Sequence, residues 1–140
     1  MDAEIRRLRR GDNAVLGRVA EGVFDEPVDG ARLAAYLVEP GHHMFVAIID
    51  GVVVGQCAAV VHRHPDKVTE LYIDEVGVAP AYHRQGIARA MLDAMFALGR
   101  ELGCGEAWVG TEPDNLRARA LYETRGGTEA EPFVMYVYQL

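Results

Sequence analysis

The chain has no long apolar run. Half of its 140 residues are hydrophobic, yet no stretch approaches the roughly 20 apolar residues that a membrane span needs. Residues 1–10 carry four arginines, but no apolar region follows them, so we expect no signal peptide. These absences predict a soluble, cytoplasmic protein that does not bind membranes.

Cysteine is scarce. Cys57 and Cys104 do not form a C-x-x-C pair, and no cysteine and histidine cluster has zinc-finger spacing. The remaining candidate ligands are two histidine pairs expected in turns, His42–His43 and His62/His64. Because neither pair shows a third ligand, we expect no metal site and two reduced, packed cysteines.

Positive charge is also in short supply. The chain has 14 Lys and Arg residues against 21 Asp and Glu residues, which gives a net charge of −7. An acidic chain repels nucleic acid and attracts cations. The balance argues against nucleic-acid binding and favours a cationic, polyamine-like substrate.

The length and the apolar periodicity predict one α/β (α+β) domain over residues 1–140. We expect helices at 13–23, 31–38, 86–102 and 115–125, and strands at 5–8, 44–49, 52–61, 68–78, 107–110 and 133–139. Asp50-Gly51 is a strong hairpin turn, whereas the unit at 68–111 needs a parallel crossover. The result is a mixed, mostly antiparallel central sheet with helices on both faces.

The segment 76–92 predicts a strand, a short basic loop, a glycine and a helix start. Such a loop can turn several backbone N–H groups toward one anion, and the helix dipole adds positive potential. Arg84 and Arg89 flank the expected anion position, and Gly86 has no side chain to obstruct it. We interpret the segment as a pyrophosphate site.

Two motifs carry a family resemblance. Residues 83–88, His-Arg-Gln-Gly-Ile-Ala, are similar to the Gln/Arg-x-x-Gly-x-Gly/Ala signature of the GNAT superfamily of N-acetyltransferases, although His83 departs from its first position. The pattern Asn115-x-x-Ala118-x-x-Leu121-Tyr122-x-x-x-Gly126 is the second match. The resemblance implies the GNAT fold and acetyl-CoA as the co-substrate.

A narrower resemblance to small aminoglycoside 3-N-acetyltransferases rests on segments 24–27, 70–76 and 133–136. It implies acetyl transfer to the 3-N position of an aminoglycoside antibiotic, and hence antibiotic resistance. Other acceptors stay open, namely a polyamine, an amino-acid derivative or a protein N-terminus, as does a non-catalytic acetyl-CoA-binding module. Many family members are dimers, so a homodimer is also left open.

The resemblance and the loop together give the expected cofactor site. Its predicted residues are Val76, Gly77, Val78, Arg84, Gln85, Gly86, Ile87, Ala88, Arg89, Asn115 and Tyr122. We expect N–H groups of Val76 or Val78 to polarise the thioester where the sheet splays, and the pantetheine arm to pass close to Gly77. Tyr122 is the expected acid for the leaving thiolate.

An amine must lose a proton before it attacks, so a base is needed. Glu70, Asp74 and Glu75 are candidates, with Asp74 first because it lies closest to the expected splay point. Strand alternation predicts that Glu70, Tyr72 and Asp74 share one face and that Glu75 points to the other. The residues expected to bind the cationic acceptor are Asp25, Glu26, Glu70, Glu112 and Asp114.

Overall fold

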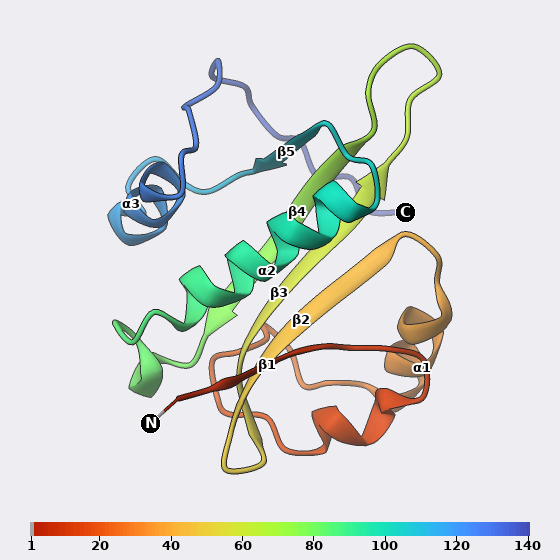
Figure 1. Cartoon of the computed structure of the whole chain (residues 1–140), viewed down its shortest axis with the longest axis vertical. Coiled ribbons are helices and arrows are strands. Elements are labelled where there is room, and N and C mark those ends of the chain that lie inside the picture. The colour runs from red at the N-terminus through yellow and green to blue at the C-terminus, as the bar shows by residue number, and fades with distance from the viewer. Residues whose placement is uncertain (1) are drawn as a thin grey trace. The chain divides into compact units, whose positions relative to one another are not determined.

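The structure, a computed structural model, describes residues 2–140, and the chain divides into two compact units, Met1–Gly110 and Thr111–Leu140. The first unit contains β1 (Glu4–Arg7), η1 (Asp12–Gly17), α1 (Gly30–Val38), β2 (His42–Ile49), β3 (Val52–His62), β4 (Glu70–Val78), η2 (Pro80–Tyr82), α2 (Ile87–Glu101) and β5 (Glu106–Val109). The second contains α3 (Leu116–Thr124), as labelled in Figure 1. The expectation of a single domain over residues 1–140 stays a prediction.

One mixed sheet forms the first unit, with its five strands in chain order. Strands β1 to β4 pair antiparallel, and β5 pairs parallel with β4 (Figure 1). The hairpin between β2 and β3 turns at Asp50 (φ 50°) and Gly51 (φ 75°), and two positive φ angles are what a type I′ turn requires. The mostly antiparallel sheet is therefore confirmed.

Helices cover both faces of this sheet. On one face, α2 runs along the strands in Figure 1 and buries Met91, Leu92 and Met95 completely. On the other face, Leu16 of η1 and Leu33 of α1 join a hydrophobic core cluster with strand residues such as Val46 and Ala58. The prediction of a sheet between two helical layers is confirmed.

The helix predicted at 13–23 is wrong in its extent. Only Asp12–Gly17 is helical, as a 3-10 turn, and Leu16 already has non-helical angles (φ −89°, ψ 18°). Beyond it, Arg18 O accepts a hydrogen bond from Val53 N, and Ala20 N donates to Val53 O. Pairing with the start of β3 satisfies these backbone groups in place of helical bonds.

The strand predicted at 133–139 is also absent. These residues have no regular secondary structure, and all are exposed. Their alternating apolar pattern favours a strand, but a strand needs a hydrogen-bonded neighbour, and no described strand pairs with the segment.

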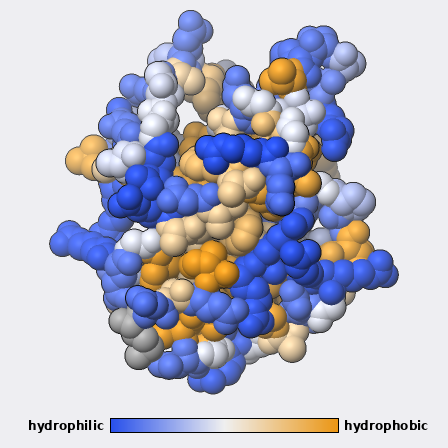
Figure 2. Space-filling model, in the orientation of Figure 1, coloured by the Kyte–Doolittle hydropathy of each residue, from blue (hydrophilic) through white to orange (hydrophobic). Residues whose placement is uncertain are grey.

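The surface of the described residues is mainly polar on the face shown in Figure 2, where hydrophobic side chains appear between larger hydrophilic areas. Among the helices of residues 2–140, none is long and apolar enough to cross a membrane.

Candidate functional site

The loop between β4 and α2 has a strained, fixed conformation. Arg84 (φ 63°) and Gly86 (φ 76°) both adopt left-handed angles within three residues. A positive φ is uncommon for arginine, and such strain persists where the surrounding structure holds it in place. At the start of the loop, Ala79 N donates to Val54 O at 2.8 Å, which ties the loop to β3.

His83 provides a second tie. Its Nε2 atom lies 2.8 Å from the carbonyl oxygen of Val78, the last residue of β4. With the proton on Nε2, the ring donates this hydrogen bond and closes the loop onto the end of the strand. The family signature has no histidine at this position, so the sequence offers no indication of the His83–Val78 hydrogen bond.

The N-terminus of α2 carries no side-chain cap. Its first intrahelical bond runs from Ala90 N to Gly86 O at 3.0 Å. The N–H groups of Ile87, Ala88 and Arg89 precede that bond, so no earlier carbonyl of the helix accepts from them. A Cβ added at Gly86 would meet nothing within 4 Å, so the space beside it is open. Free donors, open space and the helix dipole together suit an anion.

The sheet opens beside the end of β4. Strand β5 pairs only with residues 70–73 of β4. From Asp74 to Val78, β4 has β3 on one side and, within the described residues, no strand on the other. The expected splay is therefore present, and backbone groups of Val76 and Val78 are within the unpaired stretch.

Packing within the protein requires glycine at position 77. A Cβ at this position would lie 2.6 Å from the carbonyl oxygen of Val23, which is a clash with backbone. Gln56, fully buried, donates from Nε2 to the same carbonyl at 3.4 Å. The protein's own backbone therefore makes a close approach to Gly77, and the pantetheine contact at Gly77 stays a prediction.

A β-bulge places the acidic residues of β4. Ala59 pairs with Ile73 and Ala58 pairs with Glu75, so Asp74 is an extra residue between the two pairs. Because directly paired residues share a face, Glu75 lies on the face of Ala58, opposite to Ala59 and Ile73. Tyr72 is also on that face, so the expectation that Glu75 points away from it is wrong.

Both carboxylates at the bulge have raised pKa values. Burial raises the pKa of Glu75, and the nearby charges of Asp25 and Asp74 raise it further, while the Gln56 amide lowers it. Burial also raises the pKa of Asp74, which a backbone hydrogen bond and His42 partly offset. Asp74 and Glu75 thus have raised pKa values, as a general base requires, and Asp25 adds a negative charge near Glu75.

Two further groups near these acids were not identified from the sequence. Burial raises the pKa of the Tyr36 hydroxyl, and the charges of Asp74 and Glu75 add to the effect. Burial and Asp74 raise the pKa of Cys57 to about 12, so its thiol stays protonated at neutral pH. Tyr36 also lines a shallow cavity of about 210 Å³. Because Tyr36 follows an apolar helix pattern, the sequence did not indicate that it lies near the acids.

The other predicted acceptor residues are not all brought together. Glu26 is exposed close in sequence to Asp25, whereas Glu70 lies at the opposite end of β4 from Val78. Burial raises the pKa of Glu70, but hydrogen bonding with Trp108 and His64 outweighs this and leaves it lowered. Glu70 is therefore not part of the cluster at the bulge.

The remaining predicted residues belong to the Thr111–Leu140 unit. The carbonyl oxygens of Glu112 and Asp114 accept from the N–H groups of Asn115 and Leu116 at 3.0 and 2.9 Å, which forms the turn before α3. Asn115 Oδ1 then accepts from Ala118 N at 3.1 Å and caps the helix. The predicted start of this helix at Asn115 is confirmed.

Tyr122 lies in the last half of α3. Its carbonyl oxygen accepts from Gly127 N at 2.9 Å, and a Cβ at Gly127 would lie 2.8 Å from that oxygen. Gly126 follows the helix with φ 91°. The glycine pair therefore closes the helix as the sequence predicted, with Gly127 needed for space and Gly126 for its angle.

Comparison with known families agrees with this geometry. The family model described as Acetyltransferase (GNAT) family matches residues 10–127, which is most of the chain and includes parts of both units. The chain belongs to the GNAT family of acetyltransferases.

Curated relatives carry related names. The chain is 31% identical over 102 residues to the uncharacterized N-acetyltransferase Rv2669 of Mycobacterium tuberculosis, a match that covers 73% of this chain and 63% of that protein. It is 27% identical over 97 residues to aminoglycoside N(6′)-acetyltransferase type 1 of Salmonella typhimurium, which covers 66% of each. The matches thus span less than two thirds of these relatives' length.

A solved structure shows the same fold. An aminoglycoside acetyltransferase from an uncultured soil metagenomic sample, in complex with sisomicin, superposes with a TM-score of 0.84. The superposition covers 99% of this chain and 96% of that one at 23% sequence identity. The predicted GNAT fold is confirmed.

Proposed function

We propose that the chain transfers the acetyl group of acetyl-CoA to a primary amine of a cationic small molecule. The observation that carries the proposal is the uncapped start of α2, which follows the same strand that carries Asp74 and Glu75. A helix N-terminus suited to an anion therefore follows the strand that carries Asp74 and Glu75, two carboxylates with raised pKa values.

The residues at this end fit the pyrophosphate of a coenzyme A. The N–H groups of Ile87, Ala88 and Arg89 would donate to its oxygens, and the exposed side chains of Arg84 and Arg89 would add positive charge. The open space at Gly86 leaves room for the phosphate groups. When bound, acetyl-CoA supplies the activated acetyl group as a thioester.

The unpaired edge of β4 would polarise the reacting carbonyl. Backbone N–H groups of Val76 or Val78 are the donors, because β5 stops pairing at Ile73. Donors fixed in a strand need no reorganisation as negative charge develops on an oxygen. The family resemblance gives Asn115 and Tyr122 of the α3 motif as further cofactor-binding residues, with Tyr122 as the acid that protonates the leaving thiolate.

Asp74 or Glu75 would take the proton that the substrate ammonium must lose. The raised pKa of each carboxylate brings its basicity closer to that needed for proton abstraction near neutral pH. Asp74 is our first choice, because the bulge sets it at the point where the β5 pairing ends. The neutral amine then attacks the carbonyl carbon, and the thiolate leaves.

The acidic cluster favours a cationic acceptor. The charges of Asp25 and Asp74 raise the pKa of Glu75, and an ammonium group would relieve that repulsion. An aminoglycoside satisfies this chemistry, and relatives with 27% and 23% identity carry that substrate in their names. Glu26, Glu112 and Asp114 remain predicted, from the sequence, to bind the acceptor.

The two comparisons imply different positions of acetylation on an aminoglycoside. The sequence resemblance implies the 3-N amine, whereas the Salmonella relative is named for the 6′-amine. We therefore propose an aminoglycoside amine and assign the 6′ position ahead of the 3 position. Nuclear magnetic resonance of the acetylated product distinguishes the two.

The test is a thiol-release assay with acetyl-CoA against gentamicin-type aminoglycosides, spermidine and peptides. Acceleration by an aminoglycoside supports the proposal in full. Acceleration only by spermidine or peptides keeps the acetyltransferase and replaces the acceptor. Binding of acetyl-CoA without turnover of any amine identifies a non-catalytic binding module, and no binding of coenzyme A contradicts the proposal.

A matched pair of variants tests the anion site in particular. Arg89→Gln removes a charge at the start of α2, and Arg100→Gln removes one near its end. We expect Arg89→Gln to weaken coenzyme A binding roughly 10-fold, as for a hydrogen bond to a charged group. Arg100→Gln should leave the affinity unchanged. Equal effects of the two substitutions would show that only net charge matters.

A further inference from the structure

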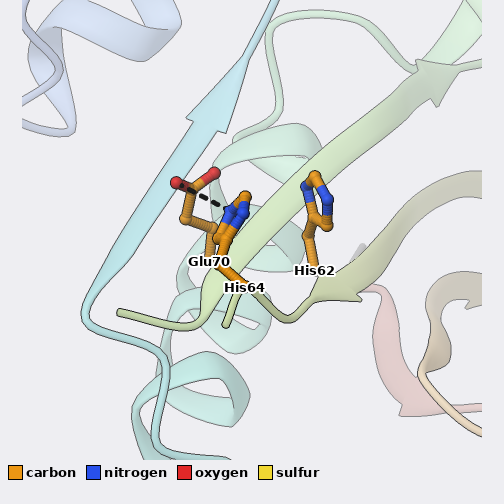
Figure 3. Close-up of side chains that lie close together, drawn as sticks. All are labelled: His62, His64 and Glu70. Atoms are coloured by element: carbon orange, nitrogen blue, oxygen red, sulfur yellow. Dashed lines mark ion pairs between the residues drawn. The ribbon is translucent and has the colours of Figure 1, made fainter. Parts of the chain in front are cut away.

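A second cluster of reactive side chains lies at the far end of the β3–β4 hairpin. His62 is the last residue of β3, and Glu70, the first of β4, is its direct partner in the sheet. His64 comes from the turn between them. One potential ligand atom from each residue lies within 4.8 Å of the others. Figure 3 shows the three side chains near one another, with the ion pair between His64 and Glu70 as a dashed line.

His64 and Glu70 form the closest pair of the cluster. Nε2 of His64 lies 3.1 Å from Oε1 of Glu70, with side chains only 14% and 16% exposed. The same nitrogen is buried. Two ligand atoms of a tetrahedral zinc ion are about 3.3–3.5 Å apart, given bonds of roughly 2.0–2.2 Å. The pair therefore has nearly the separation that a shared metal ion imposes.

Trp108 holds the carboxylate of Glu70 in place. Its Nε1 donates to Oε2 of Glu70 at 2.8 Å, and its ring stacks on Tyr72 with a centroid distance of 4.1 Å. This bond occupies the oxygen that faces away from His64, so Oε1 stays directed at the imidazole. Ligand carboxylates in metal sites are commonly oriented by such an outer hydrogen bond.

His62 completes the set. Its ring centroid lies 4.3 Å from that of His64, and the residue is exposed, so its side chain can rotate. The 4.8 Å limit exceeds a tetrahedral edge by about 1.3–1.5 Å, which a side-chain rotation can close. Two imidazoles and one carboxylate are ligands that zinc accepts, with water at the fourth position.

We propose that His62, His64 and Glu70 bind one Zn²⁺ ion that links the two strands of the hairpin. The site is separate from the proposed acetyl-transfer site, since Glu70 and Val78 are eight residues, or about 26 Å, apart along β4. The ion stabilises the turn between the strands and takes no part in acetyl transfer. The proposal therefore does not depend on the proposed function.

The test uses the full-length chain without a histidine tag, after removal of metal with a chelator. Zn²⁺ is titrated in competition with a chromophoric chelator, and Co²⁺ serves as a spectroscopic probe. We expect one Zn²⁺ per chain, tetrahedral Co²⁺ absorption without a thiolate band, and quenching of Trp108, the single tryptophan. Absence of stoichiometric Zn²⁺ binding overturns the proposal.

Matched variants assign the ligands. His64→Gln and Glu70→Gln should each weaken Zn²⁺ binding by at least 10-fold, an effect about as large as that of losing even an outer-shell partner. The controls are His42→Gln on β2 and Glu106→Gln, the β5 residue beside Glu70. Both should bind Zn²⁺ as the native chain does. Equal affinity across all four variants contradicts the assignment.

Two more variants keep the test independent of folding defects. Trp108→Phe retains a ring for stacking on Tyr72 but loses the N–H bond to Glu70, and should weaken binding about 10-fold. Cys104→Ser should bind as the native chain does, which excludes a thiol ligand. Zn²⁺ should raise the melting temperature of the native chain and of Cys104→Ser, but not that of His64→Gln. A rise in His64→Gln equal to the native rise overturns the proposal.

Discussion

Nε2 of His83 lies 2.8 Å from the carbonyl oxygen of Val78 and thereby joins the loop before α2, our proposed anion site, to the end of β4. The loop also contains Arg84 in a left-handed conformation that costs energy to hold. A side chain that ties the inside of the loop to the end of β4 can supply part of that energy. His83 is therefore a positioning residue for the N–H groups that follow.

The first prediction concerns this bond. His83→Ala should raise the Kd for coenzyme A roughly 2- to 10-fold, because a hydrogen bond contributes about 0.5–1.5 kcal/mol net. The kcat should change little, since the ring is placed to hold the loop and not the reacting atoms. His83→Gln, which keeps an N–H donor, should restore part of the affinity. Calorimetry gives the Kd, and an unchanged value in a folded His83→Ala contradicts the role.

Gly77 gives a prediction about stability. Gly77→Ala places a Cβ 2.6 Å from the Val23 carbonyl and should lower the free energy of unfolding by about 1–3 kcal/mol, the range for overpacking. Gly30→Ala is the control, because a Cβ there meets nothing within 4 Å. Denaturant unfolding of both variants measures the difference. Equal stability of Gly77→Ala and the native chain would mean that the Val23 segment moves freely.

Local features of the chain were predictable from the sequence. The hairpin at Asp50-Gly51 depends on two adjacent residues that tolerate positive φ, and the loop at Gly86 depends on one. The α2 helix follows from a regular apolar stripe that ends in glycine. Each of these features is determined by residues within a few positions of one another.

Features set by the pairing of distant strands were not predictable. The bulge at Asp74 arises from how β3 and β4 align, and it reverses the face that simple alternation gives to Glu75. The same alignment pairs His62 with Glu70, a ligand that the histidine spacing could not show. The unpaired Asp74 changes the result for Glu75, because every later side chain of β4 shifts to the other face. The His62–Glu70 pair depends instead on the length of the turn between the strands.

Asp74 is the subject of the catalytic prediction. Asp74→Asn should lower kcat/KM about 10²-fold or more if the carboxylate is the base. In the native chain, kcat/KM should fall as pH drops through the raised pKa of Asp74, because only the deprotonated form accepts a proton. Asp66→Asn, an exposed acid in the β3–β4 turn, is the control. A loss confined to KM would show that Asp74 only binds the acceptor.

Tyr122 should matter less. A thiol has a pKa near 8.5 and tyrosine near 10, so a thiolate already leaves readily near neutral pH. Tyr122→Phe should therefore lower kcat without abolishing turnover. Steady-state kinetics with acetyl-CoA and the best acceptor of the panel measure it. Complete loss of turnover in a folded Tyr122→Phe enzyme would make the hydroxyl essential.

Glu75 links the site to stability. Burial and the charges of Asp25 and Asp74 raise its pKa in the folded chain, so folding favours the protonated form. The stability associated with this group is complete below the ordinary pKa of glutamate and is lost as pH rises through the raised value. Glu75→Gln is always neutral and avoids that loss.

The variant Glu75→Gln should therefore have a higher free energy of unfolding than the native chain at pH 7. The difference should shrink as pH falls through the raised pKa and disappear below the ordinary one. Denaturant unfolding at several pH values measures it, with the exposed Glu26→Gln as the control. A gain in the free energy of unfolding that grows as pH falls would mean that the folded chain stabilises the Glu75 anion. The pKa of Glu75 would then be lowered by folding, and the expected raised value would be wrong.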